Sequence, residues 1–493
     1  MKFASKFSES KNFFLIGFLS LLFFPTFGQK VKFQRTYGGV NNDYGRSVQQ
    51  TFDKGYIIAG ATSSFGSGGT DVYLIKTDSL GNMKWSKTFG GAGVDWGYSV
   101  QQTTDSGFVV AGFTNSFGHG GYDVYLIKTD SIGDTLWTKT YGGSNWDFGY
   151  SVKQTTDGGY IITGGTYSFG HGDEDMYLIK TNSVGDTLWT RTFGGSLEDE
   201  ARSVWQNTDG GYILAGHTFS FGAGGSDYYY IRTDQNGDTL WTKTFGGTGD
   251  EKSYGVQQTT DGGFVLIGSS NSFGAGSFDF DMVKIFANGD TFFTYRSGSV
   301  DNKYAYSIVE NRNDGGYFFA GNTSYLGSQV FYWRTNPGPG WMWIWNGTYG
   351  GGSSSSTIYS VNQTLDGGFI MAGETEGFGA GLSDVYVIKT NDSGSSIQYD
   401  AVENIIVGYG YVKIYPNPFS TTSMVEFPDA IINEKKNLVF SIYDITGRKV
   451  NSYPVSSSHL KIGRDGLEQG MYFFRLEDDT EQIVYGSGKL IIH

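Results

Sequence analysis

The sequence predicts an all-β protein, a seven-bladed β-propeller with four-stranded blades followed by a small C-terminal β-sandwich. First, a unit of 52 residues recurs along most of the chain. Second, each unit holds four strand-like runs separated by turn residues. Third, 76 glycines accompany an aromatic content of 17%, so glycine marks turns while aromatic rings fill a core. The first glycine of each Tyr/Phe-Gly-Gly step marks the copies: Gly38, Gly90, Gly142, Gly194, Gly246, a degraded copy at Gly298, and Gly350.

The four runs differ in how their apolar residues are spaced. Run A is represented by Ser99–Thr103, run B by Gly159–Gly164, run C by Asp123–Thr129 and run D by Leu136–Tyr141. Runs B and C are apolar on both alternating faces, which predicts strands covered on both sides. Run D alternates between apolar and polar residues, as is typical of an outer strand with one wetter face.

A single four-stranded unit cannot bury two apolar faces by itself. The A–B connection, Thr-Asp-Gly-Gly, predicts a tight hairpin because glycine adopts the positive φ that such a turn requires. Stacking seven such antiparallel blades in a ring buries their faces against one another and leaves only short edges exposed. We therefore expect the propeller to span residues 29–391.

The two ends of the repeat region predict a closed ring. Phe33–Tyr37 is a complete run D that has no run A, B or C before it. The last copy has runs A, B and C, ending at Asp384–Thr390, but Ile397 stands where its run D should carry tryptophan. The simplest arrangement pairs Phe33–Tyr37 with Asp384–Thr390, so that the N-terminal strand completes the last blade.

Charge and composition exclude several classes of function. The net charge is −14, and the repeat region carries the excess of acids with no basic run. This argues against nucleic acid and anionic lipid as partners. The chain contains no cysteine, which excludes disulfides, thiol catalysis and thiolate metal sites.

Residues 1–28 have the pattern of a secretory signal peptide. Lys2, Lys6 and Lys11 form a basic start, and Phe13–Phe24 is a short apolar run. Small residues then precede a plausible cleavage point before Gln29. The apolar run is too short to span a bilayer, and the sequence after it has no transmembrane segment. We therefore expect a secreted protein.

The C-terminal segment, residues 411–493, reads as short alternating strands split by turns, which predicts a β-sandwich; residues 392–410 read as a linker. The segment resembles the (type A) C-terminal sorting domain of the bacterial type IX secretion system. The matching residues are Tyr415, Pro416, Asn417 and Pro418; Tyr443, Asp444, Gly447 and Arg448; Leu467, Gly470, Met471 and Tyr472; and Gly488, Lys489 and Leu490. The resemblance implies recognition by the type IX machinery and export across the outer membrane, usually with removal of the domain. It does not indicate what the exported part does.

Comparison of the copies with one another predicts a ligand face. The A–B and C–D turns are nearly constant, whereas the D–A and B–C loops vary, and in propellers of the WD-repeat kind these loops share one face. On that face Trp96, Trp146 and Phe148 are candidates for stacking on sugar rings. Their partners would be the acids and histidines of the same loops: Asp95, Asp147, Asp199, His119 and His171. The alternative is that the aromatics fill gaps between blades and the acids cap loop amides.

We find no nucleophile elbow, phosphate loop or zinc motif, and predict no catalytic residue, metal ligand or cofactor. Calcium at the recurring loop acids is an alternative. The predicted function is a secreted or cell-surface binding or adhesion module for a glycan or protein. One alternative is a polysaccharide-degrading hydrolase or lyase, which acid pairs such as Glu198/Glu200 or Asp173/Glu174 would serve if they faced each other across a cleft. The degraded sixth copy, with its extra Trp341 and Trp343, also motivates this alternative; a structural surface component is a further one.

Overall fold

The computed structural model describes most of the chain between residues 32 and 492. The gaps are 275–276, 297–299, 325–327, 339–342, 350–354, 378, 393–411, 416, 418, 428–431, 433–436, 445–447 and 479–482. The predicted signal peptide and nearly all of the predicted linker therefore lie outside the described residues. Within the described part, no helix is long and apolar enough to cross a membrane.

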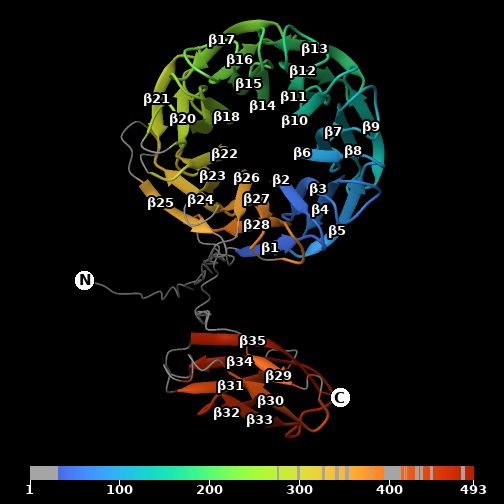
Figure 1. The fold of residues 1–493 in the computed structure, drawn as a ribbon, viewed down its shortest axis with the longest axis vertical. Coiled ribbons are helices and arrows are strands. Elements are labelled where there is room, and N and C mark those ends of the chain that lie inside the picture. The colour runs from blue at the N-terminus through green and yellow to red at the C-terminus, as the bar shows by residue number, and fades with distance from the viewer. Residues whose placement is uncertain are drawn as a thin grey trace, which may run out of the picture.

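Seven four-stranded antiparallel sheets are arranged in a ring, as Figure 1 shows. Blades 1 to 3 are β2 (Asp43–Gln50), β3 (Tyr56–Thr62), β4 (Asp71–Thr77) and β5 (Met83–Phe89); β6 (Asp95–Gln102), β7 (Phe108–Thr114), β8 (Asp123–Thr129) and β9 (Thr135–Tyr141); and β10 (Asp147–Gln154), β11 (Tyr160–Thr166), β12 (Asp175–Thr181) and β13 (Thr187–Phe193). Blades 4 to 6 are β14 (Asp199–Gln206), β15 (Tyr212–Thr218), β16 (Asp227–Thr233) and β17 (Thr239–Phe245); β18 (Glu251–Gln258), β19 (Phe264–Ser270), β20 (Asp279–Ile285) and β21 (Thr291–Arg296); and β22 (Lys303–Glu310), β23 (Tyr317–Thr323), β24 (Gln329–Thr335) and β25 (Trp343–Tyr349). The four runs of each copy are therefore the four strands of a blade, with run A nearest the ring axis.

Blade 7 joins the two ends of the ring, as predicted. It contains β26 (Ser356–Gln363), β27 (Phe369–Thr375) and β28 (Asp384–Thr390), and its outer strand is β1 (Phe33–Tyr37). The antiparallel register places Phe33 opposite Lys389 and Tyr37 opposite Val385. Both aromatic side chains are buried in the cluster between blades 7 and 1. The prediction that the N-terminal strand closes the ring is confirmed.

The hydrophobic core lies between blades rather than within them. One cluster, for example, joins Ile57 and Leu74 of blade 1 to Val100, Phe108 and Tyr125 of blade 2. In blade 1, every residue of β3 and β4 is buried. This explains why runs B and C are apolar on both faces, since each face contacts a different neighbour.

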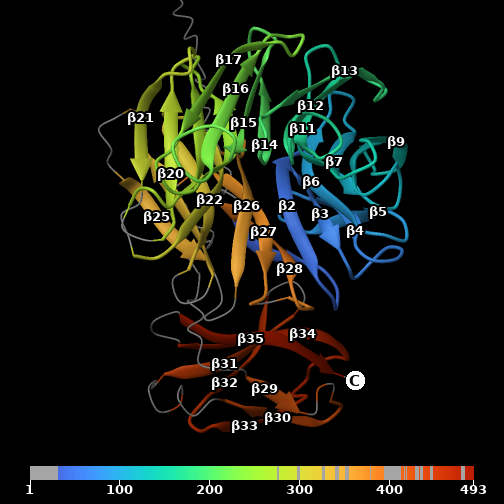
Figure 2. The same cartoon turned by 45° about the horizontal axis from the view of Figure 1, so that its top comes forward.

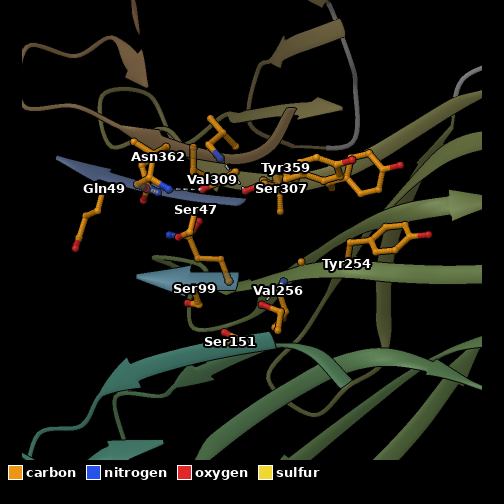
Figure 3. Close-up of a pocket in the computed structure, with 18 of the residues that line it drawn as sticks. Ser47, Gln49, Ser99, Ser151, Tyr254, Val256, Ser307, Val309, Tyr359 and Asn362 are labelled. Atoms are coloured by element: carbon orange, nitrogen blue, oxygen red, sulfur yellow. Dashed lines mark hydrogen bonds between the residues drawn. The ribbon is translucent and has the colours of Figure 1, made fainter. Parts of the chain in front are cut away.

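The polar residues of run A join the innermost strands to one another (Figure 3). The Ser47 hydroxyl accepts a hydrogen bond from the amide of Val100 at 3.2 Å, and Ser99 accepts one from Val152 at 3.2 Å. Near the end of the same strand, the side-chain oxygen Oε1 of Gln102 accepts a hydrogen bond from the Phe52 backbone amide at 2.7 Å. Similar bonds recur around the ring, and each contributes on the order of 1 kcal/mol. The Ser-Val-Gln-Gln motif therefore supplies the side chains that hydrogen-bond one blade to the next.

A cation from run C, buried in every blade but the sixth, pairs with the aspartate of the A–B turn in each blade. Lys128 Nζ lies 2.8 Å from Asp105, and Lys180 Nζ lies 2.8 Å from Asp157. The other pairs are Lys76–Asp53, Arg232–Asp209, Lys284–Asp261, Arg334–Asp314 and Lys389–Asp366. Burial opposes the charged form of Asp157, but hydrogen bonds from Lys180, Thr155 and the Gly159 amide outweigh it and lower its pKa to about 2.

The C-terminal part is a separate β-sandwich of two sheets (Figure 2). One sheet has the order β29 (Lys413–Tyr415), β30 (Thr422–Glu426), β33 (His459–Gly463); the other has the order β32 (Lys449–Pro454), β31 (Leu438–Tyr443), β34 (Gly470–Asp478), β35 (Ile483–Ile492). A core that includes Val425, Phe440 and Leu490 lies between them. This confirms the predicted fold class.

The residues of the predicted sorting motif are distributed over this sandwich. Tyr415 ends β29, and the Asn417 side-chain oxygen accepts a hydrogen bond from the Ile491 amide at 2.9 Å. Arg448 pairs with Asp444 at 3.0 Å. Gly470 and Tyr472 lie in β34, and Gly488 and Lys489 lie in β35, whereas Pro416, Pro418 and Gly447 lie outside the described residues.

We expect Phe33→Ala to lower the free energy of unfolding by about 3 kcal/mol, because it removes a buried aromatic ring from the contact that closes the propeller. Chemical unfolding followed by tryptophan fluorescence measures this. Arg35→Ala changes an exposed residue of the same strand and serves as the control, with a change below about 0.5 kcal/mol. Equal stability of the two variants would contradict the role of β1.

The lysine–aspartate pairs predict a loss of stability in acid. A carboxyl group whose folded pKa is lowered stabilises the fold above its unfolded pKa, and this contribution disappears as pH falls through the folded value. For Asp157 the window runs from about pH 4 to about pH 2. We expect Asp157→Asn to lower the melting temperature at pH 7 and to have little effect at pH 2. Scanning calorimetry at both pH values tests this; the same effect at both would contradict it.

Candidate functional site

The D–A loops and B–C loops meet on one face of the ring. The Asp95 amide donates to the carbonyl of Thr70 at 2.6 Å, which joins a D–A loop to the B–C loop of the preceding blade. Asn145 Nδ2 donates to the Tyr167 carbonyl at 2.9 Å, which joins the D–A loop before blade 3 to the B–C loop of that blade. The variable loops thus surround one mouth of the central channel.

A collar of seven large side chains, one from each blade, lines the channel below this mouth; Figure 3 labels Tyr254 and Tyr359 among them. The seven side chains enclose a cavity of ≈ 290 Å³. The guanidinium of Arg46 lies 3.9 Å from the ring centre of Tyr359, and that of Arg202 lies 4.1 Å from the ring centre of Tyr150. The collar consists of Arg46, Tyr98, Tyr150, Arg202, Tyr254, Tyr306 and Tyr359.

The predicted ligand acids Asp95, Asp147 and Asp199 are buried and cap their own loops. Asp95 Oδ2 accepts hydrogen bonds from the Gly91 amide at 2.9 Å and the Ser116 hydroxyl at 2.7 Å. Asp147 and Asp199 accept the equivalent bonds in the next two blades. These carboxylates are enclosed by the loops that they stabilise, an arrangement that the capping interpretation expects.

Trp96 and Phe148 are partly buried in aromatic contacts at the channel mouth. Trp96 stacks on Tyr44 with ring centres 4.9 Å apart, and Phe113 lies 6.4 Å away on a nearly parallel plane. Phe148 meets Phe113 edge-on at 5.2 Å. These rings close the gap between blades, and only their edges border the mouth.

Trp146 differs from the other predicted aromatics because its side chain is 52% exposed. Gly121 lies directly beneath the indole: a Cβ at that position would approach Trp146 Cδ1 to 2.1 Å. The rings of Tyr122 and Tyr167 lie 6.1 Å and 6.0 Å from Trp146. We call Tyr122, Trp146 and Tyr167 the aromatic platform. A hollow of ≈ 340 Å³ adjoins it, lined by Ser144, Asn145, Trp146, Tyr167, Gly172 and Asp173.

His119 and His171 occupy equivalent loops of blades 2 and 3 and are exposed. Their backbone amides donate to Asp123 and Asp175 at 2.7 Å and 2.6 Å, which orders the B–C loops. Of the sixth-copy tryptophans, Trp341 lies outside the described residues and Trp343 begins β25.

A polar cluster stands beside the platform, at the mouth between blades 3 and 4. We call it the acid–histidine cluster; its members are Glu174, Glu198, Glu200, Arg202 and His217. Glu200 in β14 lies directly opposite His217 in β15. Arg202 Nη2 contacts both oxygens of Glu200, at 2.7 Å and 2.9 Å. His217 Nε2 lies 3.4 Å from Glu198 and 3.7 Å from Glu200.

Two glutamates of the acid–histidine cluster have pKa values shifted in opposite directions. Burial raises the pKa of Glu174 to about 8, and the neighbouring Glu200 carboxylate adds to the rise. In contrast, the hydrogen bond from His217 lowers the pKa of Glu198. Burial and the nearby Glu174 carboxylate raise the pKa of Tyr167, so this edge of the platform lies next to the cluster.

The cluster is made of residues that depart from the repeat. Where blade 4 has the cross-strand pair Glu200 and His217, the equivalent pairs of blades 1 to 3 join an aromatic residue to a small or aromatic one: Tyr44/Ala61, Trp96/Phe113 and Phe148/Gly165. The equivalents of Arg202 in blades 2 and 3 are Tyr98 and Tyr150, whereas blade 1 also has an arginine, Arg46. The pair Glu200 and His217 is therefore what distinguishes blade 4 from the first three blades at this place.

Sequence reasoning found part of this arrangement. It singled out Trp146 and the acids Glu174, Glu198 and Glu200, and the structure brings all four to the same side of the mouth. It missed Arg202, His217, Tyr122, Tyr167 and the collar. The available signal was the comparison of run A and run B positions across the first four copies, where His217 stands in place of Ala61, Phe113 and Gly165.

Comparison with known families concerns the C-terminal sandwich. Residues 413–493 match the family model of the secretion system C-terminal sorting domain. The protein is a type IX export substrate. The sorting domain therefore directs the chain to the cell surface or the extracellular space, as the sequence predicted, and implies recognition by the type IX machinery.

Other comparisons find similarity to a curated protein and to solved structures. Regulatory protein FlaEY of Caulobacter vibrioides is 26% identical over 202 residues, which are 35% of this chain and 21% of FlaEY; the chain thus spans about a fifth of that curated relative. PorZ, a surface component of the type IX system of Porphyromonas gingivalis, is 12% identical with a TM-score of 0.34, covering 89% of this chain and 64% of PorZ. The polysaccharide lyase Uly1 is 12% identical with a TM-score of 0.43, covering 74% and 93%. With TM-scores this low, neither supports an inference about activity.

We expect Arg202→Met to destabilise the protein by roughly 3 kcal/mol at pH 7, because it leaves the buried Glu200 carboxylate without its cation. The double variant Arg202→Met/Glu200→Leu removes both charges and should recover most of that loss. Denaturant unfolding of the single and double variants measures the coupling. A double variant no more stable than Arg202→Met would contradict the ion pair's role.

Proposed function

We propose that the propeller is a glycan-binding module that acts outside the cell, with the ligand on the aromatic platform at the channel mouth. The observation that carries the proposal is the exposed, braced indole of Trp146. A tryptophan normally buries most of its large apolar surface, and one that is 52% exposed indicates a surface kept open for a partner.

The platform has the geometry that a sugar ring requires. Gly121 supports one part of the indole and leaves the remainder facing solvent, so the ring is held in place before a ligand arrives. The apolar CH face of a pyranose stacks on such a flat ring, and Tyr167 provides a second aromatic wall beside it. The Asn145 and Asp173 side chains adjoin the same hollow and offer hydrogen-bonding groups for hydroxyls.

Location supports an extracellular ligand of this kind. The sorting domain directs the propeller to the surface or the medium, where polysaccharides are abundant. The net charge of −14 favours a neutral or weakly charged polymer over a strongly anionic one, because like charges repel on approach.

Affinity electrophoresis of the purified chain through gels containing single polysaccharides tests the proposal. We expect one polymer to retard the protein and Trp146→Ala to weaken that binding at least about ten-fold, since central tryptophans dominate binding energy. Phe65→Ala is the matched control, because Phe65 is a B–C loop aromatic of blade 1 with 46% exposure. Retardation that survives Trp146→Ala, or that Phe65→Ala also abolishes, would contradict the platform. Degradation of the retarding polymer would support the cleavage alternative instead.

A further inference from the structure

We propose that the acid–histidine cluster is a binding site for a first-row divalent metal ion of the zinc class, with Glu198, Glu200 and His217 as its protein ligands. The site lies beside the aromatic platform and does not depend on the glycan proposal. Neither the repeat pattern nor the sorting domain accounts for these three residues.

The distances match those of a coordination site. One donor atom from each of the three residues lies within 4.8 Å of the other two. His217 Nε2 is 3.4 Å from Glu198 Oε1 and 3.7 Å from Glu200 Oε2. Bonds of about 2.1 Å in a tetrahedral site separate neighbouring ligand atoms by roughly 3.4 Å. An ion placed between the three donors would therefore require little movement of the side chains.

The fold holds two of the three ligands in place. Glu200 and His217 are cross-strand neighbours in the inner two strands of blade 4, and both are buried. Arg202 contacts both oxygens of Glu200 from the channel side and orients the carboxylate toward the imidazole. Glu198 lies in the D–A loop, with 41% of its side chain exposed, so the site is open to solvent on one side.

The buried groups around the site are not satisfied by the protein alone. His217 is 1% exposed, and its Nδ1 has no hydrogen-bond partner among the described residues. The carboxylates are therefore the ring's only polar contacts in that part of the chain. Glu174 is 5% exposed and lies over Gly165, the residue that occupies the position of His217 in blade 3. Its Oε1 also lacks a hydrogen-bond partner in the described part of the chain, and its nearest acidic neighbours are Glu200 and Glu198. Buried polar atoms normally have partners, and a cation held beside these acids would provide one for the Glu174 oxygen. His217 Nδ1 lies on the other side of the ring from the proposed donor Nε2 and would not gain a partner from that cation.

The donor set selects the kind of ion. Calcium and magnesium prefer oxygen ligands, whereas an imidazole nitrogen combined with carboxylate oxygens is typical of zinc and its first-row neighbours. Three protein ligands leave a coordination position for water on the exposed side, next to Tyr167 and Trp146. The alternative is a protonated His217 imidazole that forms ion pairs with Glu198 and Glu200 and needs no metal. The two explanations differ in whether the chain binds Zn²⁺ at this place.

Isothermal titration calorimetry of the full chain with Zn²⁺, after treatment with a chelator, tests the proposal. We expect one saturable site per chain and a rise in melting temperature with Zn²⁺. Glu198→Gln alters a partly exposed loop residue, so its fold should be retained, and we expect it to weaken Zn²⁺ binding at least ten-fold. His217→Ala should abolish the site.

Two further measurements make the result specific. The double variant His119→Ala/His171→Ala removes two exposed loop histidines and should leave the Zn²⁺ affinity unchanged. Excess Ca²⁺ should not displace Zn²⁺, since the imidazole disfavours it. No saturable Zn²⁺ binding, full binding by Glu198→Gln, or displacement by Ca²⁺ would overturn the proposal. Absence of saturable Zn²⁺ binding would favour the alternative, in which a protonated His217 forms ion pairs with Glu198 and Glu200.

Discussion

The packing of one aromatic ring against one glycine, repeated from blade to blade, holds the propeller together. Gly133 in the C–D turn of blade 2 has φ of 84°, and a Cβ there would approach Trp85 of blade 1 to 2.8 Å. The same contact joins Trp137 to Gly185 and Phe33 to Gly81. Because any side chain at these positions would overlap the ring, run D and the next C–D turn constrain each other. The contact therefore fixes how the outer strand of one blade lies against the C–D turn of the next.

The candidate site uses positions that this framework leaves available. The residues of this framework are the same in nearly every copy: the serines of run A join neighbouring blades, and the lysines of run C pair with an aspartate of their own blade. The second residue of each innermost strand and its partner on the next strand face the mouth instead, and there Glu200 and His217 replace apolar residues without disturbing the contacts between blades. A constant ring with variable positions around one mouth allows new chemistry to develop in a single blade.

The sequence was sufficient to predict the fold because the 52-residue period reports a physical unit. The four runs in each of seven copies predict seven four-stranded blades. The isolated run D at Phe33–Tyr37 predicts the N-terminal strand that completes blade 7. Site residues were harder to predict. Asp147 and Trp146 are adjacent in sequence, yet the first is buried under its own loop and the second is 52% exposed, because the strand begins between them. His217 lies in a run whose pattern predicts a buried strand. Its role in a site depends on Glu200, and only the pairing of the two strands places Glu200 opposite it.

Because β1 is the outer strand of blade 7, proteolysis near the two ends of the propeller has different consequences for the ring. All seven blades are complete at Thr390, so cleavage between that residue and the sorting domain removes no strand from the ring. At the other end, only residues 29–32 separate the predicted signal cleavage point from Phe33. Trimming a few residues too far would strip the outer strand from β28, a fully buried strand, and expose an apolar edge prone to aggregation. The chain can therefore lose its C-terminal address without losing a strand of the ring, whereas a cut beyond Phe33 at the N-terminal end would remove part of blade 7.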